Sequence, residues 1–401
     1  MRFCFYSGYK NLFGGYTALV ITLITELCLR GEKVVLINFK NGLIAKELSK
    51  KNIHPQLMDL DEMSWDEIST NIYSTDLFII TRFVEPFRHL IKVNPRVIYY
   101  DINDFIGQIS DYKFGIRFPR LGKKLVQKLL ANNSLVWMDD TGIFNVKKHF
   151  DIEVEHPVFL PIPVDTGFPN DYLKNAEILP GPIKLTYIGR SVNWKMMPLR
   201  KILSDITAIE KTFQVQFTVV VDDVNEFGKF VNMEDYNSIQ GFSIKVIENM
   251  LPSDIPSFLS TSHLHFAMGT AALEAAKIGV PTLLVDYSAI DFPEQYQYRW
   301  LYQTKGFSLG RNLQQVPADE GLPLKDILDD FLRNENNRMT HSSLSYDYVA
   351  KNHDAAKVVE RLVGQASIAT FRLRDSKRLI PFYFNIHGIT KKIGRILHLK
   401  Y

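Results

Sequence analysis

The sequence lacks the features expected of a secreted, disulfide-stabilised or membrane-spanning protein. It contains 2 cysteines in 401 residues, Cys4 and Cys28, so we predict buried thiols and no disulfide framework. No stretch approaches the ~18 consecutive apolar residues that a membrane-spanning helix requires. The first residues, MRFCFYS, fit a β-strand and not a signal peptide, and we therefore expect a cytoplasmic protein.

Metal-binding and dinucleotide-binding patterns are also missing. His263 and His265 alternate on an expected strand, without a cysteine or carboxylate spaced to share a metal, which favours a structural role for both. The first strand-to-helix turn is neither a Gly-x-Gly-x-x-Gly motif nor a P-loop. The sequence therefore predicts no metal site and no bound cofactor.

What the sequence does contain is a pattern of apolar strands and amphipathic helices that occurs twice. The hydrophobic fraction of 46% and the charged fraction of 23% are typical of a globular protein, and 401 residues suffice for two domains. Short apolar runs that alternate with helices indicate a parallel sheet covered on both faces. Strands are predicted at 2–7, 34–39, 76–83, 96–101 and 134–139, and again at 184–189, 217–222, 264–268 and 282–287.

A proline-rich segment between the two halves sets the predicted domain boundaries. We expect two doubly wound, Rossmann-like α/β domains at 1–165 and 184–340, joined by a linker at 166–183. One further helix is expected within 341–370, and a separate tail at 371–401. In open sheets of this kind ligands bind at the carboxyl ends of the strands, and two such domains would share an active site in the cleft between them.

The tail at 371–401 carries the most uneven charge of the chain. It has eight basic side chains and only Asp375 as an acid, whereas the net charge of the whole chain is +3. Leucine, isoleucine, phenylalanine and tyrosine lie between the basic residues, which suits contact with an anionic membrane surface. The alternative is that the apolar residues pack on the protein. Because the rest of the chain is mildly acidic, nucleic acid is not an expected partner.

Two strand-to-helix turns hold residues suited to an anionic ligand. Gly14 and Gly15 begin the first long helix, where small residues let a ligand approach the backbone. A tight turn without a ligand is the alternative. Gly189 and Arg190 follow another predicted strand, with Lys195 close behind, and two cations in this place can bind a diphosphate. Ordinary surface charge is the alternative here.

A third turn joins the predicted strand at 264–268 to a short helix. Gly269 and Thr270 would present bare backbone N–H groups and a hydroxyl at the positive end of that helix. Glu274, one turn further on, would accept hydrogen bonds from the two hydroxyls of a ribose. The structural alternative is that Thr270 only caps the helix and Glu274 only complements its dipole.

Carboxylates follow two predicted strands of the first domain. Asp101 and Asp104 are candidates for a base that takes a proton from an acceptor hydroxyl, or for groups that bind the acceptor. The alternative for these residues, and for Asp139 and Asp140, is capping of the next helix.

Together these segments resemble the donor domain of GT-B glycosyltransferases. The closest resemblance is to the large retaining family, glycosyl transferases group 1, which includes many bacterial lipopolysaccharide and capsule enzymes. The turn at 14–15 resembles that family's first glycine loop, and the segment at 162–165 resembles its hinge motif. The segments that carry the resemblance in the second domain are, in order, Gly189-Arg190, Lys195, Gly269-Thr270, Glu274 and Gly279-Val280-Pro281.

The resemblance implies roles for single residues. The family residues that match Arg190 and Lys195 hold the donor diphosphate and help it depart. The residue that matches Glu274 binds the nucleotide ribose, and the backbone at Gly269 and Thr270 approaches the phosphates and the sugar. The family's usual second glutamate, eight residues before Glu274, is replaced here by Phe266.

The function implied is transfer of a sugar from a nucleoside diphosphate donor to a lipid-linked acceptor or a growing bacterial surface polysaccharide. Retention of configuration and independence of metal are expected from the resemblance, with the acceptor on domain one. The basic tail leads us to expect an enzyme that is peripheral on the inner face of the cell membrane. A sugar-nucleotide epimerase or hydrolase of the same fold is one alternative. A catalytically inactive partner subunit is another, because Phe266 replaces the expected glutamate.

Overall fold

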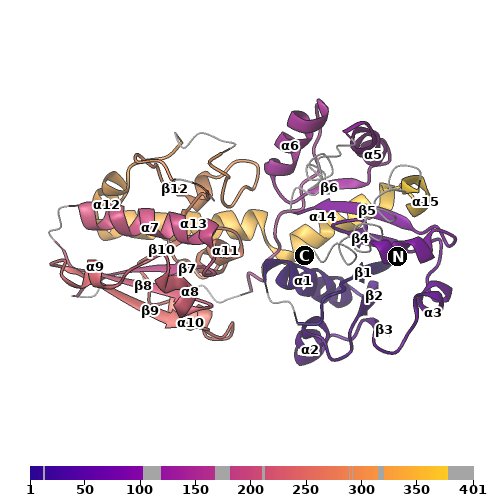
Figure 1. Cartoon of the computed structure of the whole chain (residues 1–401), viewed down its shortest axis with the longest axis horizontal. Helices are drawn as coiled ribbons and strands as arrows, with labels where there is room; N and C mark the ends of the chain where they lie inside the picture. The colour runs from indigo at the N-terminus through magenta and orange to yellow at the C-terminus, as the bar shows by residue number, and fades with distance from the viewer. Residues whose placement is uncertain are drawn as a thin grey trace, which may run out of the picture. The chain divides into compact units, whose positions relative to one another are not determined.

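The computed structural model describes residues 1–11, 14–102, 119–167, 181–209, 213–288, 290, 292–314 and 320–377 (Figure 1). It divides into two compact units. Unit 1 comprises Met1–Pro163 and Ala355–Tyr401, and unit 2 comprises Val164–Asp354. Among the described residues, no helix is both long enough and apolar enough to cross a membrane.

Unit 1 is built on a parallel six-stranded sheet in the order β3-β2-β1-β4-β5-β6. Its strands are β1 Arg2–Tyr6, β2 Lys33–Asn38, β3 Gln56–Asp59, β4 Leu77–Ile80, β5 Arg96–Asp101 and β6 Leu135–Trp137. Apolar side chains point alternately to the two faces, and each face is covered by helices. The helical elements are α1 Gly15–Leu29, α2 Leu43–Lys50, α3 Trp65–Thr70, η1 Glu85–Leu90, α5 Pro119–Ala131, α6 Asp140–Phe150, α14 Ala355–Ile368 and α15 Leu373–Ser376.

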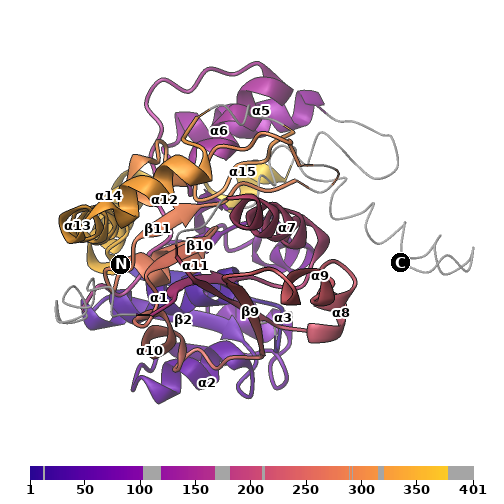
Figure 2. The ribbon, with the colours of Figure 1, turned by 90° about the vertical axis from the view of Figure 1, so that its left-hand side faces the viewer.

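Unit 2 repeats this strand order, with β7 in the place of β1 and an antiparallel strand, β12, at one edge. Its strands are β7 Ile183–Ile188, β8 Val215–Val221, β9 Phe242–Glu248, β10 Leu264–Ala267, β11 Thr282–Leu284 and β12 Arg299–Trp300. Helices α7 and α12 pack on one face of the sheet, and α10 and α11 on the other (Figure 2). The helical elements are α7 Asn193–Ala208, α8 Val224–Gly228, α9 Glu234–Asn237, α10 Ile255–Leu259, α11 Thr270–Ala276, η3 Leu301–Gln303, α12 Leu324–Arg333 and α13 Glu335–Asn352.

The predicted α/β class and the nine predicted strands are confirmed, with ends that differ by a few residues. Strands β3, β9 and β12 were not predicted. Each of them is an edge strand of its sheet. Strand β9 alternates between buried or half-buried and exposed side chains, and β12 has only two residues, so neither forms the continuous apolar run by which a central parallel strand is recognised.

The prediction of a single helix within 341–370 is wrong, because the structure has two helices, α13 and α14, separated at His353 and Asp354. Helix α13 ends unit 2, and α14 packs against α1 in unit 1. Unit 2 begins at Val164 and ends at Asp354. The N–H of Val164 donates to the carbonyl of His353 at 2.8 Å, so the first and last segments of unit 2 are hydrogen-bonded to each other. The break between the helices is therefore a return point of the chain.

Candidate functional site

The carboxyl edge of the unit 2 sheet brings two of the predicted turns together. Strands β7 and β10 are parallel neighbours, and their register pairs Tyr187 with Phe266. Arg190 and Gly269 each follow that pair by three residues, beyond the ends of the two strands. The turn that carries Arg190 therefore lies beside the turn that begins α11, as is expected at the carboxyl edge of a parallel sheet.

Gly189 lets the chain turn tightly at the end of β7. A Cβ atom at this position would lie 2.7 Å from Cε1 of the buried Tyr187 ring. That tyrosine donates its hydroxyl hydrogen to the carbonyl of Lys195 at 2.9 Å, which ties the strand to the first turn of α7. Burial raises the pKa of Tyr187, so the hydroxyl remains a donor. Gly189 thus allows the ring to lie under the turn that carries Arg190 and leads to Lys195 in α7.

The two predicted cations both lie near one aromatic ring. The guanidinium carbon of Arg190 is 6.0 Å from the centre of the Trp194 ring, and Nζ of Lys195 is 5.2 Å from the same centre. Trp194 is half-buried and packs edge-on against Tyr287. The ring is therefore a fixed surface beside which two positive charges are gathered.

Burial and the neighbouring Arg190 lower the pKa of Lys195 to about 8, although Asp222 acts in the opposite direction. Helix α7 begins at Asn193 without a side-chain cap and without an acidic residue in its first turn. Two like charges and a positive helix end all favour an anion at this place. A diphosphate would relieve the repulsion that lowers the pKa of Lys195.

Gly269, the residue that caps α11, adopts φ 62° and ψ −140°. This is backbone geometry that glycine tolerates and other residues avoid. Its N–H donates to the carbonyl of Leu309 at 2.7 Å, so the prediction that this N–H is bare is wrong. Thr270 follows as the first residue of α11 and is half-buried.

Replacing Gly269 by alanine is expected to lower the free energy of unfolding by about 1–3 kcal/mol, because alanine pays the strain of this backbone conformation. The space around the missing Cβ is open, so the effect would come from the backbone and not from a clash. Urea denaturation measures it. Gly228→Ala in α8 is the control, since Gly228 also has open space but no positive φ. Equal midpoints for the two variants would refute the strain argument.

Glu274 lies one turn into α11 with a side chain that is 27% exposed. Its Oε2 is 2.7 Å from Nζ of Lys277, whose own side chain is only 8% exposed. This i,i+3 pair fixes the carboxylate, and a carboxylate held in this way can accept two neighbouring hydroxyls. The geometry therefore suits the ribose-binding role expected for Glu274.

Phe266, which stands where the resembling family has a second glutamate, belongs to the core of unit 2. The ring is fully buried in β10, 6.1 Å from the centre of the Phe217 ring and 5.9 Å from that of Tyr298. A side chain in this position packs in the core between the sheet and its helices, and does not reach a ligand at the carboxyl edge of the sheet. The neighbouring His265 and the preceding His263 have pKa values lowered to about 3 and about 4, chiefly by burial, in line with the structural role predicted for them.

The predicted residues of unit 1 have mixed outcomes. Asp101 ends β5, is 4% exposed and packs against the first turn of α6 beside Trp137, which favours a structural role over that of an acceptor base. Asp139 caps α6 by accepting from the N–H of Thr141 at 2.9 Å. Asp104 lies outside the described residues. Gly14 and Gly15 begin α1, as predicted.

Sequence reasoning missed Asp222 and Ser191, which lie beside the two cations. Asp222 directly follows β8, and its Oδ1 accepts from the N–H of Ser191 at 2.6 Å. The signal was present, because Asp222 closes the apolar run FTVVVD at the end of a predicted strand. Among the described residues, no group of three or more His, Cys, Asp or Glu side chains could hold a metal ion.

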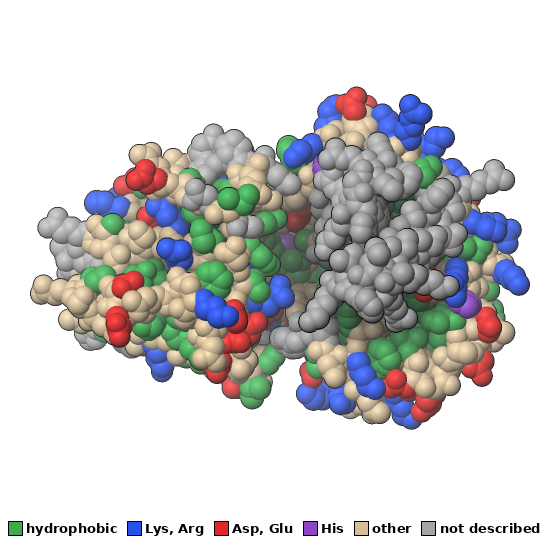
Figure 3. All heavy atoms as spheres, viewed as in Figure 1, with side chains coloured by type: hydrophobic (Ala, Val, Ile, Leu, Met, Phe, Trp, Pro, Cys, Tyr) green, Lys and Arg blue, Asp and Glu red, His purple; other side chains and the backbone are tan. Residues whose placement is uncertain are grey.

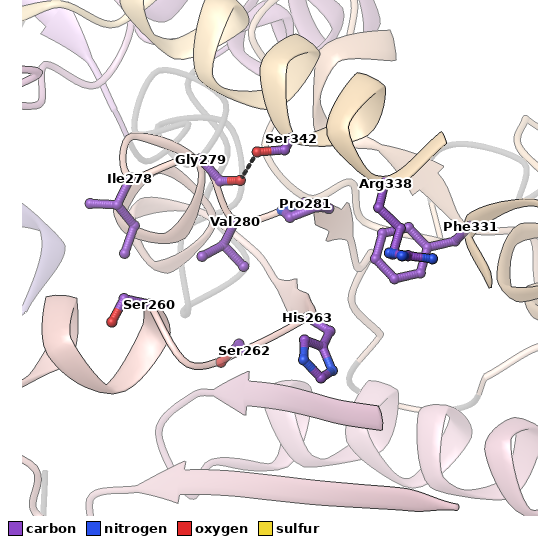
Figure 4. A pocket seen from close by; sticks show the side chains of 10 residues that line it. All are labelled: Ser260, Ser262, His263, Ile278, Gly279, Val280, Pro281, Phe331, Arg338 and Ser342. Carbon is purple, nitrogen blue, oxygen red and sulfur yellow. Dashed lines mark hydrogen bonds between the residues drawn. The ribbon is translucent and has the colours of Figure 1, made fainter. Parts of the chain in front are cut away.

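A small crevice lies at the opposite, amino-terminal edge of the same sheet (Figure 4). The hydroxyl of Ser342 on α13 donates to the carbonyl of Gly279 beside it. The crevice has room for about one water molecule, so it is no site for a nucleotide. Its lining residues are Ser260, Ser262, His263, Ile278, Gly279, Val280, Pro281, Phe331, Arg338 and Ser342.

Comparisons by sequence find nothing: no family model and no curated protein matches the chain. Comparison by structure finds solved structures that are similar along nearly the whole chain. A glycosyltransferase from Rickettsia africae superposes with a TM-score of 0.59 and 13% identity, covering 91% of this chain and 97% of the other.

Two further solved structures contain nucleotides. Anabaena HepE, in complex with UDP and glucose, gives a TM-score of 0.57 at 11% identity, covering 92% of this chain and 99% of its own. The E. coli trehalose-6-phosphate protein bound with UDP-2-fluoro glucose gives 0.56 at 12% identity, covering 91% and 99%. At such identities the likeness establishes the fold. The chain has the GT-B fold of glycosyltransferases, with two Rossmann-like α/β domains.

Proposed function

We propose that this chain is a glycosyltransferase that binds a nucleoside diphosphate sugar on unit 2. The observation that carries the proposal is the pair of cations, Arg190 and Lys195, gathered beside Trp194 where β7 meets α7. The adjacent α11 adds Glu274 for the ribose. Two proteins of the same fold have been solved with UDP or a UDP-sugar, which makes a UDP-sugar the first donor to test.

The chemistry proposed is transfer at the anomeric carbon. The bond from that carbon to the diphosphate oxygen breaks, a bond to an acceptor hydroxyl oxygen forms, and the hydroxyl proton is released. The diphosphate leaves with the bonding electrons, and Arg190 and Lys195 stabilise its charge. Retention of configuration, and catalysis by these cations without a metal, are proposed from the sequence resemblance.

For the acceptor we propose a lipid-linked glycan or a growing bacterial surface polysaccharide, such as a capsule or lipopolysaccharide, bound by unit 1. Of the predicted tail, residues 371–377 belong to unit 1, where Phe371 and Leu373 are buried. The part that would hold the cytoplasmic enzyme at the inner face of the membrane is therefore 378–401, which lies outside the described residues. On the face drawn in Figure 3, the described basic side chains stand among acidic ones, which supports a partner other than nucleic acid.

Two alternatives to a glycosyltransferase can be separated from it by experiment. A sugar-nucleotide epimerase or hydrolase would convert the donor without an acceptor, so incubation with donor alone separates it from a transferase. The specific observation that favours an inactive partner subunit is Phe266, which is fixed in the core where a sugar-binding glutamate is usual. Sugar transfer by the purified chain would exclude that alternative.

A nucleotide screen tests donor binding directly. A ligand that binds only the folded state at a hundred times its Kd stabilises it by ~2.7 kcal/mol, so the matching UDP-sugar should raise Tm. Sugars linked to GDP and dTDP are the comparison, and Arg190→Ala should reduce the shift without abolishing it. Failure of every nucleotide to raise Tm would contradict the proposed function.

A further inference from the structure

Asp222 and Asp223 lie at the end of β8, next to the strand that leads to Arg190. The N–H of Ser191 donates to Oδ1 of Asp222 at 2.6 Å. The hydroxyl of Ser191 donates to the carbonyl of Asp223, also at 2.6 Å. The backbone directly after Arg190 is therefore fixed by two hydrogen bonds to the neighbouring strand end.

The two adjacent carboxylates have different partners. Oδ1 of Asp223 accepts from the N–H groups of Asn225 and Glu226, at 2.8 and 2.9 Å, and so caps α8. The carboxylate of Asp222 instead accepts from the Arg190 loop. Of these two carboxylates, it is therefore that of Asp222 that joins the end of β8 to the Arg190 loop.

Asp222 also acts on the charge of Lys195. Burial and Arg190 both lower the pKa of Lys195, and Asp222 is the neighbouring group that raises it. The charged groups that act on this lysine are Arg190, in the turn before α7, and Asp222, at the end of β8. The Tyr187 hydroxyl donates to the backbone carbonyl of Lys195. The carboxylate therefore helps the lysine to keep the proton that a diphosphate site requires.

We propose that Asp222 is a positioning residue of the donor site, which holds the Arg190 loop through Ser191 and supplies the counter-charge for Lys195. This inference rests on the proposed function of the site. Asp222 need not contact the donor in this role. Its hydrogen bond to Ser191 and its negative charge act separately, and different substitutions remove them.

Three variants distinguish these roles. Asp222→Asn keeps an oxygen that accepts from Ser191 but removes the charge. Asp222→Ala removes both. Asp223→Asn is the matched control, because it removes the same charge one residue away and asparagine is also a good helix cap. Thermal melting of each variant shows whether it folds.

The first measurement is the rate of acetylation of Lys195 by acetic anhydride as a function of pH, followed by mass spectrometry. Only the neutral amine reacts, so the midpoint should lie at about 8 in the wild type. It should fall in both Asp222 variants and stay unchanged in Asp223→Asn. An unchanged midpoint in the Asp222 variants, or an equal shift in the control, overturns the charge role.

The second measurement is the affinity for UDP between pH 6.5 and 9.5. Asp222→Asn should bind UDP normally at the acid end and lose affinity at a lower pH than the wild type does. Asp222→Ala should in addition bind about tenfold more weakly at every pH, because the loop loses its hydrogen bond. Normal binding by Asp222→Ala overturns the positioning role. If the wild type fails to bind UDP while the acetylation midpoint still shifts, the proposed donor fails and the charge coupling stands.

Discussion

Replacing Arg190 by alanine is expected to lower kcat/KM for sugar transfer by about 10²–10³-fold, the usual effect of removing one group that stabilises developing charge. Arg190 is exposed at the end of β7, so its loss leaves the core of unit 2 unchanged. The guanidinium would bind the diphosphate most strongly as negative charge builds on it during bond cleavage. The loss should therefore appear mainly in kcat, and steady-state kinetics with a saturating donor measures it.

Two further variants sharpen this result. Arg190→Lys keeps the charge but loses the planar fork, so its activity should fall between those of the wild type and the alanine variant. Arg200→Ala removes an exposed arginine from α7, about two turns after the start of that helix, and should leave activity unchanged. Full activity in Arg190→Ala, or equal losses in both alanine variants, would place the leaving-group site elsewhere.

Replacing Asp286 by alanine is expected to destabilise the protein by about 3–5 kcal/mol, because it removes the buried counter-charge of Arg299 and Arg311. Arg311 also pairs with Glu320 at 2.9 Å, but that carboxylate is 60% exposed. Asp286 follows β11 and is fully buried. Its carboxylate accepts from Arg299 at 3.0 Å and from Arg311 at 2.9 Å, and both of these side chains are less than a tenth exposed. Chemical denaturation with far-UV circular dichroism measures the loss.

The control for this effect is an exposed ion pair in the same unit. Asp329 pairs with Lys325 on α12 at 2.6 Å, with side chains that are 55% and 62% exposed. Asp329→Ala should cost about 0–1 kcal/mol. A destabilisation by Asp286→Ala no greater than this would mean that the buried arginines find water or other partners.

Sequence periodicity was sufficient for the central strands, because parallel strands covered on both faces are continuous apolar runs. It failed for β9, whose outward residues include Ser243 and Lys245, and for the break between α13 and α14. No proline or glycine marks that break: His353 and Asp354 end the helix because the chain there pairs with Val164, a contact distant in sequence. Long-range contacts of this kind leave no local signal.

In the candidate site, too, some features could be predicted from local sequence and others depend on the fold. The order of Gly189, Arg190 and Lys195 at a strand end was enough to predict where cations gather. The hydrogen bond from Gly269 to Leu309 and the core position of Phe266 required the fold, since each depends on the partner that the fold brings close. Asp101 shows the same limit: the sequence places a carboxylate at a strand end, but only the fold shows that it is buried against the next helix.

The return of the chain to unit 1 has a consequence for synthesis on the ribosome. Helix α14 contributes Val358, Val359 and Leu362 to the same core as α1, and the carbonyl of Phe371 accepts from the N–H of Val97 at 2.9 Å. Unit 2 is one uninterrupted stretch of chain, whereas unit 1 is completed by residues that are translated after it. The N-terminal sheet is synthesised first, but the apolar face that α14 covers stays partly exposed to solvent until unit 2 has been translated.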